Sequence, residues 1–120
     1  MLVADDDADI VRFVELNLRL EGFRVLTARD GQEALTKALE LQPDVVLLDV
    51  LMPRIDGYTV CARLRADHRG AAIPVILVTA NFITADEEVA RQAGADDLVI
   101  KPFDPYELMA RVKALLRSRP

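Results

Sequence analysis

Four short apolar runs in the chain are each followed at once by a polar residue that could take part in chemistry. These residues are the triplet Asp5-Asp6-Asp7 after residues 2–4, Asp49 after residues 45–48, Thr79 after residues 75–78, and Lys101 after residues 98–100. A site that combines carboxylates, a hydroxyl and an ammonium suits a divalent metal ion, a phosphoryl group and an aspartate nucleophile.

The apolar runs belong to a pattern in which a strand and a helix alternate five times. Short runs rich in Val, Ile and Leu predict buried strands, and apolar residues at helical spacing predict helices. The predicted strands cover residues 2–4, 23–28, 44–48, 75–78 and 97–100, and the predicted helices begin near residues 7–9, 30, 57, 84 and 104. We expect Gly22 and Gly94 to end the first and fourth helices as left-handed caps, and the last helix to end near Arg117.

This alternation predicts an α/β fold with a flavodoxin-like, doubly wound, five-stranded parallel sheet and five helices. Strands joined through helices must run parallel, with right-handed crossovers. With the strand order 2-1-3-4-5, the first and third strands lie side by side where the order reverses, and ligands bind at the carboxyl ends of strands there. Asp5, Asp6 and Asp49 should therefore meet, although they are far apart in the sequence.

Length and composition limit the classes of function. The chain of 120 residues fits one domain, and 52% of it is apolar, so it can build a core. The net charge of −5 argues against nucleic-acid binding by this chain alone. We see no apolar run long enough to span a membrane and no signal peptide, so we expect a cytoplasmic protein. The single Cys61 cannot form an internal disulfide, and we expect it in the core.

The three carboxylates would repel one another in a cleft unless a cation lies between them. Mg²⁺ suits such a site, because it prefers oxygen ligands and keeps several water ligands. Asp49 can act as the nucleophile, while Lys101 and Thr79 can contact phosphoryl oxygens. Taken alone, the triplet starting at Asp5 could be only a helix cap. A calcium loop does not fit, because Ile10 stands at the position that requires glycine.

Motifs along the whole chain resemble a receiver domain of a two-component response regulator. The residues that carry the resemblance are Leu2-Val3-Ala4-Asp5-Asp6-Asp7, Leu47-Leu48-Asp49-Val50-Leu51-Met52-Pro53, Asp56-Gly57, Val78-Thr79-Ala80, Gly94-Ala95 and Lys101-Pro102-Phe103. The resemblance implies a phosphorylation-controlled signalling switch rather than a metabolic enzyme. Its only catalysis would be its own phosphorylation and dephosphorylation.

The resemblance also implies roles for individual residues. Asp49 would accept a phosphoryl group from a histidine kinase or a phosphotransfer protein. Asp6 and Asp49 would bind Mg²⁺ directly, Asp5 would bind it through water, and the backbone carbonyl of Leu51 would be a further ligand. Thr79 and Lys101 would contact the phosphoryl oxygens, and the Lys101-Pro102 peptide bond would be cis. We expect a receiver domain over residues 1–117, with residues 118–120 as a tail or the start of a linker, and a downstream effector domain or protein.

Two features depart from the family pattern. Many receiver domains carry Tyr or Phe three residues before the lysine, where this chain has Leu98, so we expect signalling to run mainly through the loop after Thr79 and the fourth helix. Residues 86–88 are acidic where one subfamily has basic residues that pair across a dimer. The remaining residues that resemble that dimer face, which involves helix 4, strand 5 and helix 5, are Asp96, Asp97, Glu107 and Arg111. We expect a monomer or a weak dimer.

Three other interpretations use the same fold. A flavodoxin-like electron carrier would need a hydroxyl-rich phosphate loop after the first strand, and aspartates stand there instead. An aspartate-nucleophile phosphohydrolase usually carries its nucleophile on the first strand, and this chain leaves little room for a substrate cap. A degenerate receiver that serves only as a scaffold would not need the complete residue set found here.

Overall fold

The predicted sheet order is confirmed by the computed structural model, which describes residues 1–79 and 87–117. Five parallel strands pair in the order β2-β1-β3-β4-β5. The strands are β1 (Leu2–Ala4), β2 (Leu26–Ala28), β3 (Val46–Asp49), β4 (Val75–Thr79) and β5 (Asp97–Ile100). The helices are α1 (Ala8–Leu20), α2 (Gly31–Leu41), α3 (Gly57–Ala66), α4 (Glu87–Ala93) and α5 (Pro105–Arg117).

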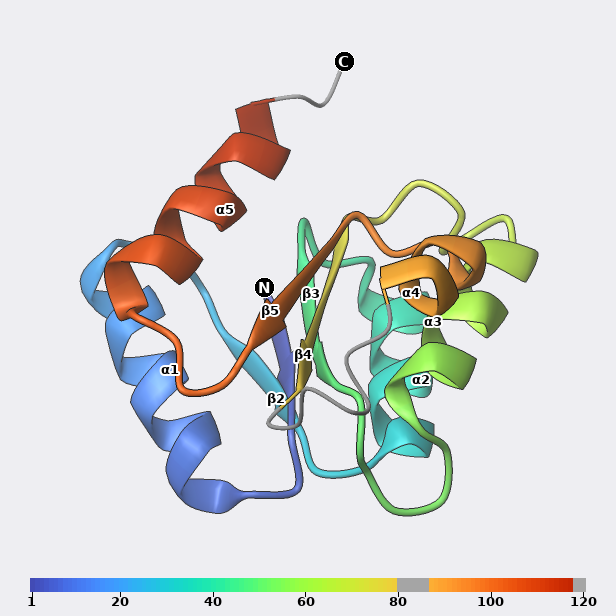
Figure 1. Ribbon diagram of the computed structural model, residues 1–120, viewed down its shortest axis with the longest axis horizontal. Coiled ribbons are helices and arrows are strands. Elements are labelled where there is room, and N and C mark those ends of the chain that lie inside the picture. The colour runs from blue at the N-terminus through green and yellow to red at the C-terminus, as the bar shows by residue number, and fades with distance from the viewer. Residues whose placement is uncertain (80–86, 118–120) are drawn as a thin grey trace.

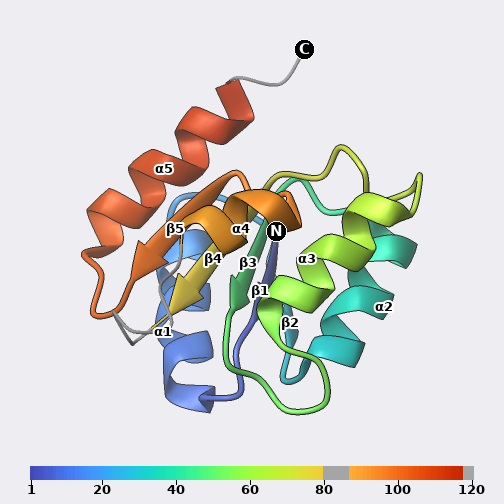
Figure 2. The same cartoon turned by 45° about the vertical axis from the view of Figure 1, so that its right-hand side comes forward.

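Helices cover both faces of the sheet. Helices α1 and α5 lie on one face, and α2, α3 and α4 lie on the other (Figures 1 and 2). The side chains of the central strands alternate between two apolar cores, because successive residues of a strand point to opposite faces. In β3, Val46 and Leu48 face the α2–α4 side, while Leu47 faces the α1/α5 side. Burial on both faces explains why the central strands read as continuous apolar runs.

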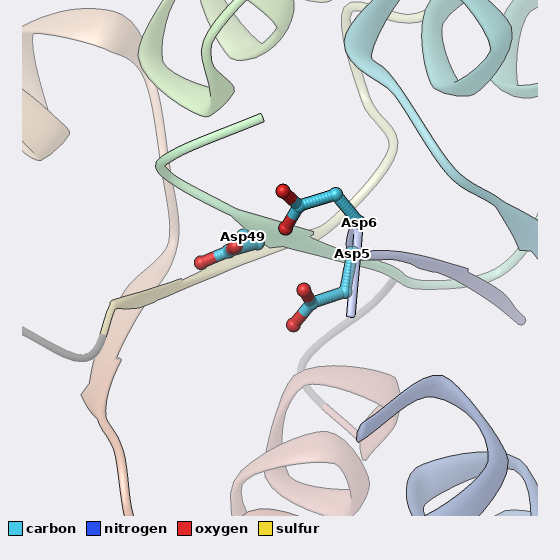
Figure 3. Close-up of side chains that lie close together, drawn as sticks. All are labelled: Asp5, Asp6 and Asp49. Atoms are coloured by element: carbon cyan, nitrogen blue, oxygen red, sulfur yellow. The ribbon is translucent and has the colours of Figure 1, made fainter. Parts of the chain in front are cut away.

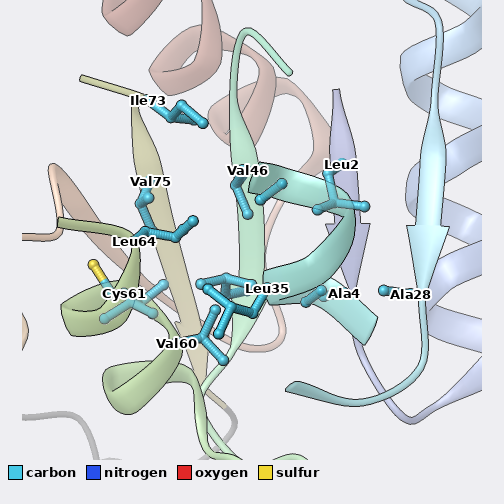
Figure 4. Close-up of a cluster of buried hydrophobic side chains, with 14 of the residues drawn as sticks. Leu2, Ala4, Ala28, Leu35, Val46, Val60, Cys61, Leu64, Ile73 and Val75 are labelled. Carbon is cyan, nitrogen blue, oxygen red and sulfur yellow. The ribbon is translucent and has the colours of Figure 1, made fainter. Parts of the chain in front are cut away.

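The core on the α2–α4 side, which we call the α2–α4 core, brings strand residues against helices α2 and α3 (Figure 4). It includes Leu2, Ala4, Ala28, Leu35, Val46, Val60, Cys61, Leu64, Ile73 and Val75. Cys61 is fully buried, as predicted, and burial raises the pKa of its thiol to about 11. The thiol is therefore a packing group rather than a nucleophile.

Aspartates cap the first turns of four helices. The carboxylates of Asp7, Asp30, Asp56 and Asp104 accept backbone N–H bonds from the first turns of α1, α2, α3 and α5. Such caps satisfy N–H groups that have no partner within the helix. Gly22 and Gly94 both have a φ of 92°, which confirms their predicted left-handed conformation. The chain therefore turns sharply from strand to helix at the edge where the polar residues lie.

Several element boundaries differ from the prediction. Strand β2 covers only Leu26–Ala28 instead of residues 23–28, because its partner β1 offers only three residues for pairing. Strand β3 begins at Val46 rather than residue 44 and includes Asp49, and β4 includes Thr79. The predicted start of the fourth helix at residues 84–86 lies outside the described residues.

Among the residues that the structure describes, no helix combines the length and the apolar composition needed to cross a membrane.

Candidate functional site

The three predicted carboxylates meet at the carboxyl ends of two neighbouring strands. Asp5 and Asp6 follow β1, and Asp49 ends β3, which pairs directly with β1. One carboxylate oxygen from each residue lies within 4.8 Å of the others, and Figure 3 shows the three side chains gathered at this point. Asp5 and Asp49 are only 4% and 8% exposed, whereas Asp6 is open to solvent. The cluster therefore has a buried base and an exposed mouth.

Thr79 and Lys101 come to the same edge from the next two strands. Thr79 is fully buried at the end of β4, and its backbone carbonyl accepts a hydrogen bond of 2.7 Å from the Lys101 N–H. The Lys101 ammonium lies 2.6 Å from Asp5 Oδ2 and 3.6 Å from Asp49 Oδ1. The peptide bond between Lys101 and Pro102 is cis, as the resemblance implied. The structure thus brings all the predicted strand-end side chains to one edge.

Charge and burial shift the pKa values of Asp49 and Lys101. Burial, and next the negative charge of Asp5, raise the pKa of Asp49 to about 7, although the charge of Lys101 opposes the shift. Burial alone would lower the pKa of Lys101, but the hydrogen bond to Asp5 and the charges of Asp49 and Asp5 together raise it. One lysine does not neutralise three neighbouring carboxylates. The site therefore favours an additional cation.

The chemistry of the donor set fits Mg²⁺. The cluster offers only carboxylate oxygens, which are the ligands of hard divalent ions, and its exposed side leaves room for water. Zinc sites, in contrast, usually contain His or Cys ligands. Asp5 already accepts hydrogen bonds from Lys101 and, at 2.9 Å, from the backbone N–H of Asp7. These partners leave Asp6 and Asp49 as the better candidates for direct contact with an ion.

The loop between β3 and α3 carries the predicted carbonyl ligand of Leu51. A hydrogen bond joins the two ends of this loop: the N–H of Gly57 donates to the carbonyl of Val50 at 2.8 Å. A Cβ atom on Gly57 would lie 2.5 Å from the carbonyl oxygen of Asp49. The sequence indicated Gly57 only as part of a family motif and carried no signal for this close approach, which only a glycine permits.

The family model of the response regulator receiver domain matches residues 1–113 of this chain. The chain belongs to this family. It is thus a receiver domain of the kind that response regulators use in two-component signalling. This membership removes the electron-carrier and phosphohydrolase interpretations.

Curated relatives of this receiver domain include transcriptional regulators. The chain is 46% identical over 117 residues to the DNA-binding dual master transcriptional regulator RpaA of Synechocystis, covering 98% of this chain and 48% of that protein. It is 45% identical to the DNA-binding response regulator MtrA of Mycobacterium leprae, with coverages of 98% and 51%. The chain therefore spans about half the length of these relatives.

Solved structures show the same fold. The chemotaxis protein CheY4 of Vibrio cholerae superposes with a TM-score of 0.88 at 30% identity, covering 95% of both chains. The receiver domain of the sensor histidine kinase PA1611 from Pseudomonas aeruginosa has a TM-score of 0.86 at 33% identity, covering 98% of this chain and 97% of that one. That structure holds a magnesium ion coordinated in its active-site cleft.

The residues that depart from the family pattern also have defined places. Leu98 is partly buried on β5 and packs against the α2–α4 core. Arg111 binds two acidic groups of its own chain, Asp97 Oδ1 at 2.7 Å and Glu107 Oε1 at 3.1 Å. Asp96 pairs with Arg65. Charged side chains that resemble a dimer face are therefore engaged within this chain.

Proposed function

We propose that this receiver domain takes a phosphoryl group onto Asp49 from the phosphohistidine of a histidine kinase or phosphotransfer protein. One observation carries the proposal. Asp49 lies between the carboxylates of Asp5 and Asp6 on one side and the ends of β4 and β5, with Thr79 and Lys101, on the other. A nucleophile in that position has a cation site and two phosphoryl-binding groups beside it.

The transfer step follows from these positions. A carboxylate oxygen of Asp49 attacks phosphorus while the phosphorus–nitrogen bond breaks, and the departing imidazole keeps the electron pair and takes up a proton. The positive charge of Lys101 and the hydroxyl of Thr79 stabilise the phosphoryl oxygens. A bound Mg²⁺ would supply charge neutralisation and orientation, which are the main needs of phosphoryl transfer. Deprotonated Asp49 is the reactive form. A bound Mg²⁺ would favour that form against the burial that raises the pKa of Asp49 to about 7 in the metal-free site.

The metal ligands in this proposal are the side chains of Asp6 and Asp49, Asp5 through water, and the backbone carbonyl of Leu51. The convergence of the three carboxylates supports this set of ligands. Both oxygens of Asp5 already accept hydrogen bonds, which favours contact between Asp5 and the ion through water. Leu51 lies two residues after Asp49, in the loop that closes over the end of β3.

The output depends on a partner beyond the receiver fold. We propose that residues 1–117 act as the receiver unit, with residues 118–120 as a tail or linker, and that they control an effector domain or protein in the cytoplasm. The DNA-binding relatives favour a transcriptional effector, whereas the net charge of −5 argues against DNA contact by the receiver itself. The intrachain pairing of Arg111 supports a monomer or a weak dimer, which sedimentation would distinguish.

A phosphodonor assay tests the acceptor. Incubation with phosphoramidate and Mg²⁺ should add the mass of one phosphoryl group to the wild-type chain and none to Asp49→Asn. Asp44→Asn is the matched control, because its exposed carboxylate precedes β3 at the opposite end of the strand. A phosphoryl group that maps to Thr79 or to another aspartate would overturn the assignment.

A further inference from the structure

The start of α2 touches the loop between β3 and α3. The backbone N–H of Gly31, the first residue of α2, donates to the carbonyl of Pro53 at 3.4 Å. A Cβ atom on Gly31 would lie 2.0 Å from the carbonyl oxygen of Ile55 and 2.8 Å from its carbonyl carbon. These atoms belong to the backbone and cannot turn away as a side chain could. The loop therefore occupies the space that a side chain at residue 31 would need.

A second contact joins the same two segments. One carboxylate oxygen of Asp30 caps α2 by accepting the N–H of Glu33 at 2.8 Å, and the other lies 3.5 Å from Nε of Arg54. Arg54 has a φ of 73°, a conformation that is unusual for a residue other than glycine. The loop therefore takes an unusual backbone turn at the residue that pairs with the helix cap.

The other end of the loop is fixed against β3. Gly57 lies too close to the Asp49 carbonyl to carry a Cβ atom, and its N–H binds the Val50 carbonyl. Between these ends, the side chains of Met52 and Ile55 pack against the α2–α4 core. The segment that holds the Leu51 carbonyl is thus placed by contacts at both ends.

We infer that Gly31 is a positioning residue for the divalent-cation site, an inference that rests on the proposed function. Because Gly31 has no side chain, the loop between β3 and α3 can pack directly against the start of α2. This contact sets the position of the Leu51 carbonyl relative to the carboxylates. A Cβ atom at residue 31 would have to push the Ile55 carbonyl about 1.4 Å away to reach an ordinary contact. Mg²⁺ demands near-ideal octahedral geometry. A movement of the loop that displaces the Leu51 carbonyl would therefore weaken the binding of Mg²⁺.

The variant Gly31→Ala tests this role through the affinity for Mg²⁺, measured by calorimetric titration. Gly31 does not need a left-handed backbone, and alanine favours helices, so the substitution acts through the loop contact. We expect the dissociation constant for Mg²⁺ to rise about tenfold, as for other residues that support metal ligands. Gly22→Ala is the matched control, because it strains a φ of 92° where nothing lies within 4 Å of the new Cβ atom. Its Mg²⁺ affinity should match the wild type.

A second variant tests the contact between the loop and α2 if Gly31→Ala does not fold. Arg54→Gly removes the pair with Asp30 and relaxes the positive φ, and we expect its dissociation constant to rise about two- to fivefold, the size expected for a surface ion pair. An unchanged affinity in folded Gly31→Ala, or in Arg54→Gly if the first variant does not fold, refutes the inference alone. A wild-type chain that binds no Mg²⁺ refutes the proposed metal site and the inference with it. Amide NMR signals of residues 50–57 should shift in Gly31→Ala before Mg²⁺ is added, and unmoved signals would also refute the inference.

Discussion

Lys101 leans toward Asp5 rather than toward the proposed phosphoacceptor Asp49. Its ammonium lies 2.6 Å from Asp5 Oδ2 and 3.6 Å from Asp49 Oδ1. The strongest neutralising contact in the cluster therefore goes to the residue that we assign to water-mediated metal contact. Asp49 keeps a raised pKa because burial and the charge of Asp5 outweigh the attraction of Lys101.

The raised pKa of Asp49 predicts that stability falls as the pH rises from about 4 to about 7 in the presence of a chelator. An unfolded chain loses this proton near its ordinary value of 3.8, whereas the folded chain keeps it up to about 7. The folded state therefore binds more protons in that window, and the free energy of unfolding decreases with pH. Asp49→Asn should be more stable than the wild type by roughly 2–4 kcal/mol near pH 8 and equally stable near pH 4.

Denaturant titrations across this pH range would check that prediction. Asp44→Asn, an exposed carboxylate at the other end of the strand, should show no such gain at high pH. If the unfolding free energies of the wild type and Asp49→Asn depend on pH in the same way, burial and the charge of Asp5 do not raise the pKa of Asp49 as stated.

Binding of Mg²⁺ should raise the melting temperature of the wild-type chain. A ligand that binds only the folded state stabilises it by about 2.7 kcal/mol at a hundredfold excess over its dissociation constant. Asp6→Asn should lose most of this shift, whereas Glu40→Gln, an exposed acid on α2, should keep it. Melting curves by circular dichroism with Mg²⁺ or with a chelator would decide; identical curves for the wild type would argue against the site.

Removing Arg65 should destabilise the fold more than its partial exposure suggests. Its guanidinium donates to the backbone carbonyls of Gly94 at 2.8 Å, Ile73 at 2.7 Å and Gly70 at 3.0 Å, and it also binds Asp96. Loss of these charged hydrogen bonds in Arg65→Ala should cost about 2–4 kcal/mol of unfolding free energy.

Arg63 provides the matched comparison for Arg65, because it lies in the same helix and is exposed. Arg63→Ala should change the unfolding free energy by less than about 0.5 kcal/mol, as is usual for surface substitutions. If chemical denaturation gives similar losses for both variants, the carbonyl contacts of Arg65 contribute little.

Phosphorylation should affect the region from Thr79 into α4 more than Leu98. Leu98 has no ring that could alternate between buried and exposed positions, and it packs against the α2–α4 core. Residues 80–86, which include the loop after Thr79, lie outside the described residues. Amide NMR spectra with and without beryllofluoride, a phosphoryl mimic, should show the largest changes at residues 79–88. A large change at Leu98 with a quiet 79–88 segment would contradict the prediction.

The sequence predicted that the strand-end residues meet, because the carboxyl ends of parallel strands share one edge. The strand order 2-1-3-4-5 was that of the flavodoxin-like fold and does not follow from the alternation of strands and helices alone. The sequence did not predict the length of β2, because pairing there depends on how many residues β1 offers. It also missed the contact of Gly31 with Ile55, since no local pattern links a helix start to a loop more than twenty residues away. Close approaches of this kind arise from packing between elements.

The sheet also divides the site between its two faces. By strand alternation, Asp49 follows Leu47 on the α1/α5 side, whereas Thr79 follows Leu77 on the α2–α4 side. A phosphoryl group on Asp49 that binds Thr79 would therefore span both layers at one edge of the sheet. Because the two cores pack on opposite sides of the sheet, the surface of one layer can change without repacking the other. Substitutions on the surface of one layer can therefore change the partner that binds that layer and leave the other surface as it is.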